Sequence, residues 1–114
     1  MQDLHIHMAN DVVQTSRLLI VDDDAYLRAT LRQQFLAEGF SDIFQVGIVA
    51  DLDPMLARAN PDLILLDVQL PDGNGVDICQ RLRRSGFSKP IIMLTAKGAE
   101  DDIVRCLEAG ANDY

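Results

Sequence analysis

The sequence predicts an α/β domain built on an open, doubly wound parallel sheet. Three apolar runs carry this prediction: residues 18–21 (LLIV), 63–66 (LILL) and 91–94 (IIML). Each run is uninterrupted rather than alternating, which is typical of a strand covered on both faces. Segments with helical periodicity separate the runs, and alternation of strands and helices calls for parallel strands joined by helical crossovers.

The first half of the chain supplies two strands and two helices. Apolar side chains recur every fourth residue in 25–38, at Leu27, Leu31 and Phe35. This spacing predicts an amphipathic helix, and Gly39 follows it as a C-terminal stop. Asp42–Val46 is a weaker strand, and residues 51–59 are expected to form a short helix.

The second half repeats the alternation. Pro61 and Pro90 stand just before the second and third apolar runs, where a missing N–H donor does little harm to a strand. Helices are expected over Gly75–Arg84 and over 99–109, and Gly110 ends the last one. The predicted order of elements is therefore βαβαβαβα.

Length, charge and hydropathy narrow the class of protein. A chain of 114 residues has room for one domain, which we place at 17–114 after a flexible N-terminal tail at 1–16 without sustained periodicity. The net charge of −8 argues against nucleic-acid binding by this domain alone. The apolar runs are far shorter than the roughly 20 residues that span a bilayer, and there is no secretory pattern. We therefore expect a cytoplasmic protein without a membrane segment.

Oxygen-bearing side chains follow three of the predicted strands: Asp22 and Asp23 follow the first run, Asp67 the second and Thr95 the third. The carboxyl ends of parallel strands meet at one edge of the sheet, so these side chains should converge. Clustered carboxylates repel one another and favour a hard cation such as Mg²⁺. A carboxylate beside that ion can attack a phosphoryl group to give an acyl phosphate. Alternatively, residues 22–24 only cap the following helix.

Four segments of the chain resemble those of response-regulator receiver domains, over about residues 17–114. They are LLIVDDDAYLR, PDLILLDVQLPDGNG, PIIMLTA and EAGANDY. The resemblance implies a flavodoxin-like (CheY-like) fold with strand order 2-1-3-4-(5). It also implies a Mg²⁺-dependent phosphorylation switch.

The resemblance further implies a role for individual residues. Asp67 would be the phosphoacceptor and would share a Mg²⁺ ion with Asp23, which ligates directly, and Asp22, which acts through a water. The backbone carbonyl of Gln69 would complete the protein's ligands. Thr95 would contact the phosphoryl group and shift inward when it arrives, and Tyr114 falls at the family's aromatic switch position, whose rotamer follows the threonine. Gln69 and Lys97 would tune phosphoryl lifetime unless they are ordinary solvated loop residues.

The donor must come from another molecule, because His5 and His7 in the tail are the only histidines. A sensor histidine kinase or a histidine phosphotransfer protein is the expected partner, or else a small acyl-phosphate-like donor. The domain would catalyse only its own phosphoryl transfer and hydrolysis, so it is not expected to be an enzyme in the usual sense.

One departure from the family pattern lies at the C-terminal end. The chain stops at Tyr114, before the family's conserved Lys and with its fifth strand and fifth helix largely missing. We interpret it as a truncated receiver in which Lys97 does not replace that Lys. Ile91–Leu94 would then be an exposed apolar edge, which predicts self-association. A sharp monomer in sizing experiments at high concentration would count against it.

Two other functions stay open. A degenerate or truncated receiver would act only as a docking or dimerisation module. A phosphohydrolase of the haloacid-dehalogenase type would instead use Asp22 as nucleophile and Asp24 as acid-base residue, which leaves Asp67 and Thr95 without roles.

Overall fold

The part of the protein that the structure describes contains a four-stranded parallel sheet with the strand order β2-β1-β3-β6. The structure is a computed structural model that describes residues 16–94, 108 and 110–112. The strands are β1 (Arg17–Val21), β2 (Asp42–Val46), β3 (Leu63–Asp67) and β6 (Ile91–Leu94). This arrangement confirms the predicted fold class and the predicted order of the first four strands. The helix expected over 99–109 falls almost entirely outside the described residues.

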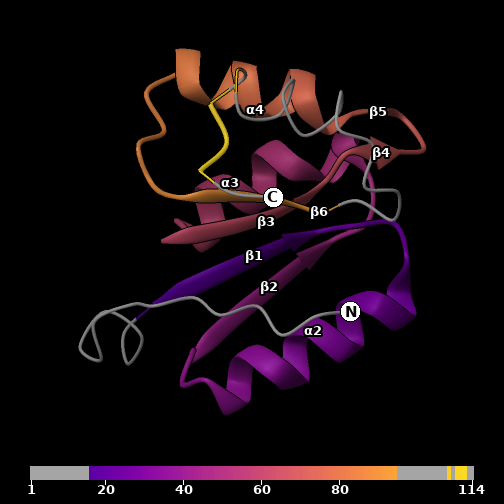
Figure 1. Ribbon diagram of the computed structural model, residues 1–114, viewed down its shortest axis with the longest axis vertical. Coiled ribbons are helices and arrows are strands. Elements are labelled where there is room, and N and C mark those ends of the chain that lie inside the picture. Colours follow the sequence, from indigo (N-terminus) through magenta and orange to yellow (C-terminus); the bar gives the residue numbers. More distant parts are fainter. Residues whose placement is uncertain (1–15, 95–107, 109, 113–114) are drawn as a thin grey trace.

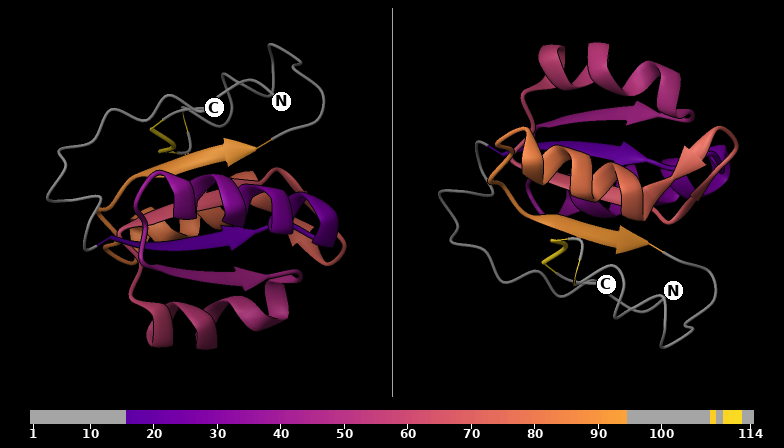
Figure 2. Two further views of the ribbon diagram at one scale, coloured as in Figure 1. Left: turned by 90° about the horizontal axis from the view of Figure 1, so that it is seen from below. Right: turned by 90° about the horizontal axis from the view of Figure 1, so that it is seen from above.

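Helices cover both faces of this sheet (Figures 1 and 2). Helix α2 (Ala25–Ala37) lies on one face, and α3 (Leu52–Ala59) and α4 (Gly75–Arg84) lie on the other. Successive residues of a strand point to opposite faces, so each strand contributes to two cores. Leu18 and Ile20 pack in the core that contains Leu31 of α2, whereas Leu19 and Val21 pack in the core that contains residues of α4. Burial on both faces is why the strands are apolar without alternation.

Helix ends follow the signals in the sequence closely. The Asp24 carboxylate caps α2 by accepting a hydrogen bond from the Leu27 amide at 3.1 Å, and Glu38 is the C-terminal cap. Gly39 follows with a φ of 104°, a left-handed conformation that glycine adopts at little cost. Asn60 ends α3 with a φ of 44°, which asparagine tolerates better than most residues.

A 3-10 turn and a small hairpin near the carboxyl ends of the strands are not predicted by the sequence. A 3-10 turn, η1 (Val49–Asp51), precedes α3, and β4 (Gln69–Leu70) pairs antiparallel with β5 (Gly73–Asn74). The two strands form a small hairpin that leads into α4. The Asp72 carboxylate joins the hairpin to η1 by accepting hydrogen bonds from the amides of Val49 at 2.7 Å and Ala50 at 3.1 Å.

Replacing Asp72 with alanine is expected to lower the melting temperature. The two amide hydrogen bonds hold the pKa of Asp72 below its ordinary value, so the fold is stabilised by the ionised carboxylate. This stabilisation is present above the ordinary pKa of 3.8 and is lost as the pH falls through the lowered one. Thermal melts at pH 7 should separate Asp72→Ala from the parent, with Asp72→Asn in between because it keeps one acceptor oxygen. Equal melting temperatures for all three proteins would contradict this role.

Strand β6 lies at the edge of the described sheet, but its side chains are not exposed. All four residues of Ile91–Leu94 are buried because they alternate between the two cores. Residues 110–112 approach its beginning, where the Asn112 amide donates to the Ile91 carbonyl at 2.8 Å. The expectation of an exposed apolar edge is therefore wrong for the side chains. Self-association through this edge strand stays a prediction, but exposed apolar side chains no longer support it.

The basic residues at the end of α4 do more than complement the helix dipole. Arg81 pairs with Asp53 of α3 at 3.0 Å, and the Arg83 guanidinium hydrogen-bonds to the chain after the helix. Arg84 is exposed.

None of the helices in the described ranges has the length and hydropathy that crossing a bilayer requires.

Candidate functional site

Three carboxylates gather at the carboxyl end of the two central strands. Asp22 and Asp23 follow β1 directly, and Asp67 is the last residue of β3. Each offers a carboxylate oxygen, and these oxygens lie within 4.8 Å of one another. Asp22 is buried, Asp67 is partly buried and Asp23 is exposed. The predicted convergence of these residues is therefore present in the structure.

Asp22 is held by hydrogen bonds on three sides. Its amide donates to the Val46 carbonyl at 3.0 Å, which continues the pairing of β1 with β2. Its carboxylate accepts from the Asp24 amide at 2.8 Å, and its backbone carbonyl accepts from the Arg28 guanidinium. Asp22 is only 3% exposed, so burial removes most of the water around it. These hydrogen bonds take the place of the lost water.

Asp67 is placed by the close approach of α4 to β3. The Gly75 amide donates to the Val68 carbonyl at 2.7 Å, and the Val68 amide donates to the Leu94 carbonyl at 3.0 Å. A Cβ on Gly75 would stand 2.1 Å from the Asp67 carbonyl oxygen, so only glycine fits there. The Asp67 carboxylate accepts a hydrogen bond from the Gln69 amide at 3.2 Å.

Burial and mutual repulsion raise the pKa values of two of these carboxyls. The pKa of Asp67 rises to about 6, mainly through burial, with the charges of Asp22 and Asp23 adding to it and the Gln69 amide opposing it. The pKa of Asp22 is also raised, mainly by burial, although the Asp24 amide and the Arg28 charge oppose the shift. A cation at this point would relieve both effects. Clustered carboxylate oxygens are the donors that fit a hard divalent ion such as Mg²⁺.

Replacing Asp67 with asparagine is expected to stabilise the metal-free protein at pH 7. The folded state binds the Asp67 proton more tightly than the unfolded state, so its stability falls as the pH rises from 3.8 to about 6. The asparagine side chain carries no such charge, and the free energy of unfolding should increase by roughly 1–3 kcal/mol. Urea unfolding at pH 4 and pH 7 in EDTA would measure the difference between variant and parent. If Asp67→Asn is less stable than the parent at pH 7, the raised pKa of Asp67 is contradicted.

Asp24 has a different role from its two neighbours. Its carboxylate caps α2, as the alternative interpretation of residues 22–24 expected, while Asp22 and Asp23 join the acidic cluster. The capping interpretation is thus confirmed for Asp24, whereas Asp22 and Asp23 lie in the acidic cluster. The haloacid-dehalogenase alternative needs Asp24 as an acid-base residue, whereas the capping bond directs its carboxylate to the Leu27 amide.

The other predicted site residues are less fully placed. Gln69 is exposed in β4 and lies next to the cluster, because its backbone amide donates a hydrogen bond to the Asp67 carboxylate. Thr95, Lys97 and Tyr114 lie outside the described residues. Sequence reasoning missed Arg28 and Gly75, because nothing in their local sequence shows that they approach the backbones of Asp22 and Asp67.

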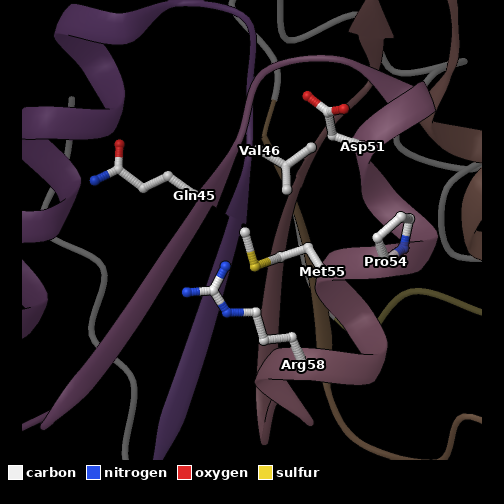
Figure 3. Close-up of a pocket in the computed structure, with 6 residues that line it drawn as sticks. All are labelled: Gln45, Val46, Asp51, Pro54, Met55 and Arg58. Carbon is white, nitrogen blue, oxygen red and sulfur yellow. The ribbon is translucent and has the colours of Figure 1, made fainter.

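A separate groove of about 260 Å³ runs between β2 and α3 (Figure 3). Its lining mixes apolar and charged side chains: Gln45, Val46, Asp51, Pro54, Met55 and Arg58. None of the three clustered carboxylates lines it. The chemistry that the sequence predicts therefore belongs to the end of the sheet and not to this groove.

Comparisons with known proteins agree with this geometry. The family model of the response regulator receiver domain matches residues 18–114. The response regulator MprA of Mycobacterium sp. (strain KMS) is 40% identical over 99 residues, which cover 86% of this chain and 42% of that protein. The chain thus spans less than half the length of this curated relative.

Solved structures show the same fold. A response regulator of Chloroflexus aurantiacus superposes with a TM-score of 0.81 at 32% identity, covering 88% of this chain and 83% of that one. The CheX-CheY-BeF3-Mg complex of Borrelia burgdorferi gives a TM-score of 0.76 at 28% identity, covering 83% and 72%. With the family match over nearly the whole chain, the protein belongs to the response regulator receiver domains of two-component systems.

Proposed function

We propose that this domain accepts a phosphoryl group on Asp67 in a Mg²⁺-dependent reaction and changes conformation in response. The observation that carries the proposal is the convergence of Asp22, Asp23 and Asp67 within 4.8 Å at the carboxyl end of the central strands. Family membership supports it, as does the similarity to the CheX-CheY-BeF3-Mg complex of Borrelia burgdorferi.

The acidic cluster would hold the metal ion. Asp23 and Asp67 would ligate Mg²⁺ directly, Asp22 would act through a water, and the carbonyl of Gln69 would complete the protein's ligands. When bound, the ion supplies positive charge that offsets the carboxylates and the transferred phosphoryl oxygens. The residues present fit a Mg²⁺ ion because they offer clustered carboxylate oxygens. Burial and mutual repulsion raise the pKa values of Asp22 and Asp67, and a bound cation would stabilise their ionised forms.

Asp67 would act as the nucleophile. One carboxylate oxygen would attack the phosphorus of a phosphohistidine, so that an O–P bond forms and the P–N bond breaks. The electron pair stays on the imidazole nitrogen, which takes up a proton. The Gln69 amide, 3.2 Å from the Asp67 carboxylate, fixes the side chain during this step.

The expected partner is a sensor histidine kinase or a histidine phosphotransfer protein. The domain would catalyse only transfer to itself and hydrolysis of its own acyl phosphate. Thr95 and Tyr114 would carry the conformational response, and Gln69 and Lys97 would tune phosphoryl lifetime.

Two measurements on matched variants test the proposal. Calorimetric titration should show Mg²⁺ binding to the parent that is lost in Asp23→Ala. Uptake of phosphate from acetyl phosphate should be lost in Asp67→Asn, although that variant remains folded. Asp42→Asn is the control, because Asp42 begins β2 at the opposite end of the sheet. A folded parent without Mg²⁺ affinity or uptake would favour the docking-module alternative and contradict the switch.

A further inference from the structure

Arg28 of α2 contacts the acidic site without belonging to the carboxylate cluster. One nitrogen of its guanidinium, Nη1, donates to the backbone carbonyl of Asp22, and Nε donates to the side-chain oxygen of Gln45 at 3.2 Å. The guanidinium also lies over the chain after β2, where a Cβ on Gly47 would stand 3.1 Å from Nη1. Arg28 therefore joins α2, the end of β1 and the edge strand β2.

Gln45 acts as the second anchor of this bridge. Figure 3 shows its side chain directed toward α2, away from Met55 and Arg58 in the groove. Alternation along β2 explains the direction, because Ile43 faces the α2 side of the sheet and Gln45 lies two residues later. The planar guanidinium donates in fixed directions, so two acceptors define its orientation as well as its position.

The bonded carbonyl belongs to the peptide group that links Asp22 to Asp23. The Asp22 amide is already fixed by the Val46 carbonyl at 3.0 Å. With its carbonyl held by Arg28, the peptide plane that leads to Asp23 has little freedom to rotate. The directions in which the Asp22 and Asp23 side chains leave the backbone depend on that plane.

We propose that Arg28 is a positioning residue that holds the Asp22–Asp23 peptide in the geometry needed to bind the cation, with Gln45 orienting the guanidinium. The inference rests on the proposed function, because it concerns the same metal site. Partners behind metal ligands commonly change metal affinity by about 10–100-fold when removed. Arg28 differs from such partners in acting through the backbone of the ligand loop.

Calorimetric Mg²⁺ titration of four variants tests this role. Arg28→Gln should weaken Mg²⁺ binding by about 10-fold or more. Arg28→Lys should give an intermediate affinity, because one ammonium group keeps the charge but cannot reproduce the fixed fork. Gln45→Ala, at an exposed position where loss of folding is not expected, should weaken binding in the same direction but less than Arg28→Gln, because it removes only one of the two acceptors of the guanidinium. Arg32→Gln, one turn further along α2 and exposed, is the matched control and should bind as the parent does.

A second measurement uses the metal-free protein. The Asp24 amide, which donates to the Asp22 carboxylate at 2.8 Å, should exchange with solvent faster in Arg28→Gln than in the parent or in Arg32→Gln. Parent-like affinity in Arg28→Gln, full recovery in Arg28→Lys, or unchanged exchange at Asp24 would each overturn the positioning role while leaving the proposed function intact. Absence of Mg²⁺ binding in the parent would instead overturn the proposed function, and this inference with it.

Discussion

Replacing Gly75 with alanine is expected to cost about 3 kcal/mol or more of the free energy of unfolding. The new Cβ would stand 2.1 Å from the Asp67 carbonyl oxygen and 3.0 Å from the Val68 Cα. Both neighbours are backbone atoms of β3 and the loop after it, so they cannot move aside as a flexible side chain would. Relief requires α4 to shift, which also stretches the 2.7 Å hydrogen bond from the Gly75 amide to the Val68 carbonyl.

Gly86→Ala is the matched control for this prediction. Gly86 has a φ of 99°, but no heavy atom lies within 4 Å of a Cβ built there. Alanine at Gly86 should therefore cost only the backbone strain, about 1–2 kcal/mol. Urea unfolding of both variants gives the comparison. If Gly75→Ala is as stable as Gly86→Ala, or more stable, α4 does not approach the Asp67 backbone as closely as the structure shows.

Replacing Arg83 with methionine is expected to cost about 2–4 kcal/mol. The guanidinium donates to the carbonyls of Gly110 at 2.9 Å, Phe87 at 2.8 Å and Lys89 at 2.7 Å, and to the side-chain oxygen of Asn112 at 2.7 Å. One side chain thus joins the end of α4 to the loop before β6 and to residues 110–112. Methionine keeps most of the aliphatic stem, so the loss reports on the hydrogen bonds.

Arg84→Met separates these hydrogen bonds from the helix dipole. Arg83 and Arg84 both lie in the last turn of α4, so a purely electrostatic role would make the two substitutions equivalent. The structure predicts that Arg84→Met changes the free energy of unfolding by about 0.5 kcal/mol or less, because the residue is exposed. Equal losses in the two variants, measured by thermal or urea unfolding, would show that the dipole alone accounts for Arg83.

The sequence predicts the regular elements of this fold well, because their signals are local. The expected bounds of β2, β6 and α4 are those of the structure. Apolar runs define the strands, while Gly39 and Pro90 mark ends and beginnings that the backbone follows. The acidic cluster was also predictable, since parallel strands bring their carboxyl ends to one edge whatever their order.

What the sequence does not predict depends on contacts between distant segments. The hairpin of β4 and β5 has strands of two residues, too short for any periodicity, and is joined to η1 by Asp72 across 22 or more positions of the chain. In the sequence, Arg28 and Arg83 resemble ordinary basic helix residues. Their partners, Asp22, Gln45 and residues 110–112 among them, are known only once the chain has folded.

The most direct test of the central claim is to locate the phosphoryl group itself. The protein would be incubated with acetyl phosphate and Mg²⁺, reduced with borohydride to trap any acyl phosphate, and mapped by peptide mass spectrometry. We predict modification at Asp67 that disappears when Mg²⁺ is removed by EDTA. Modification at Asp22 instead, or none at Asp67 in a folded protein that binds Mg²⁺, would contradict the proposed function.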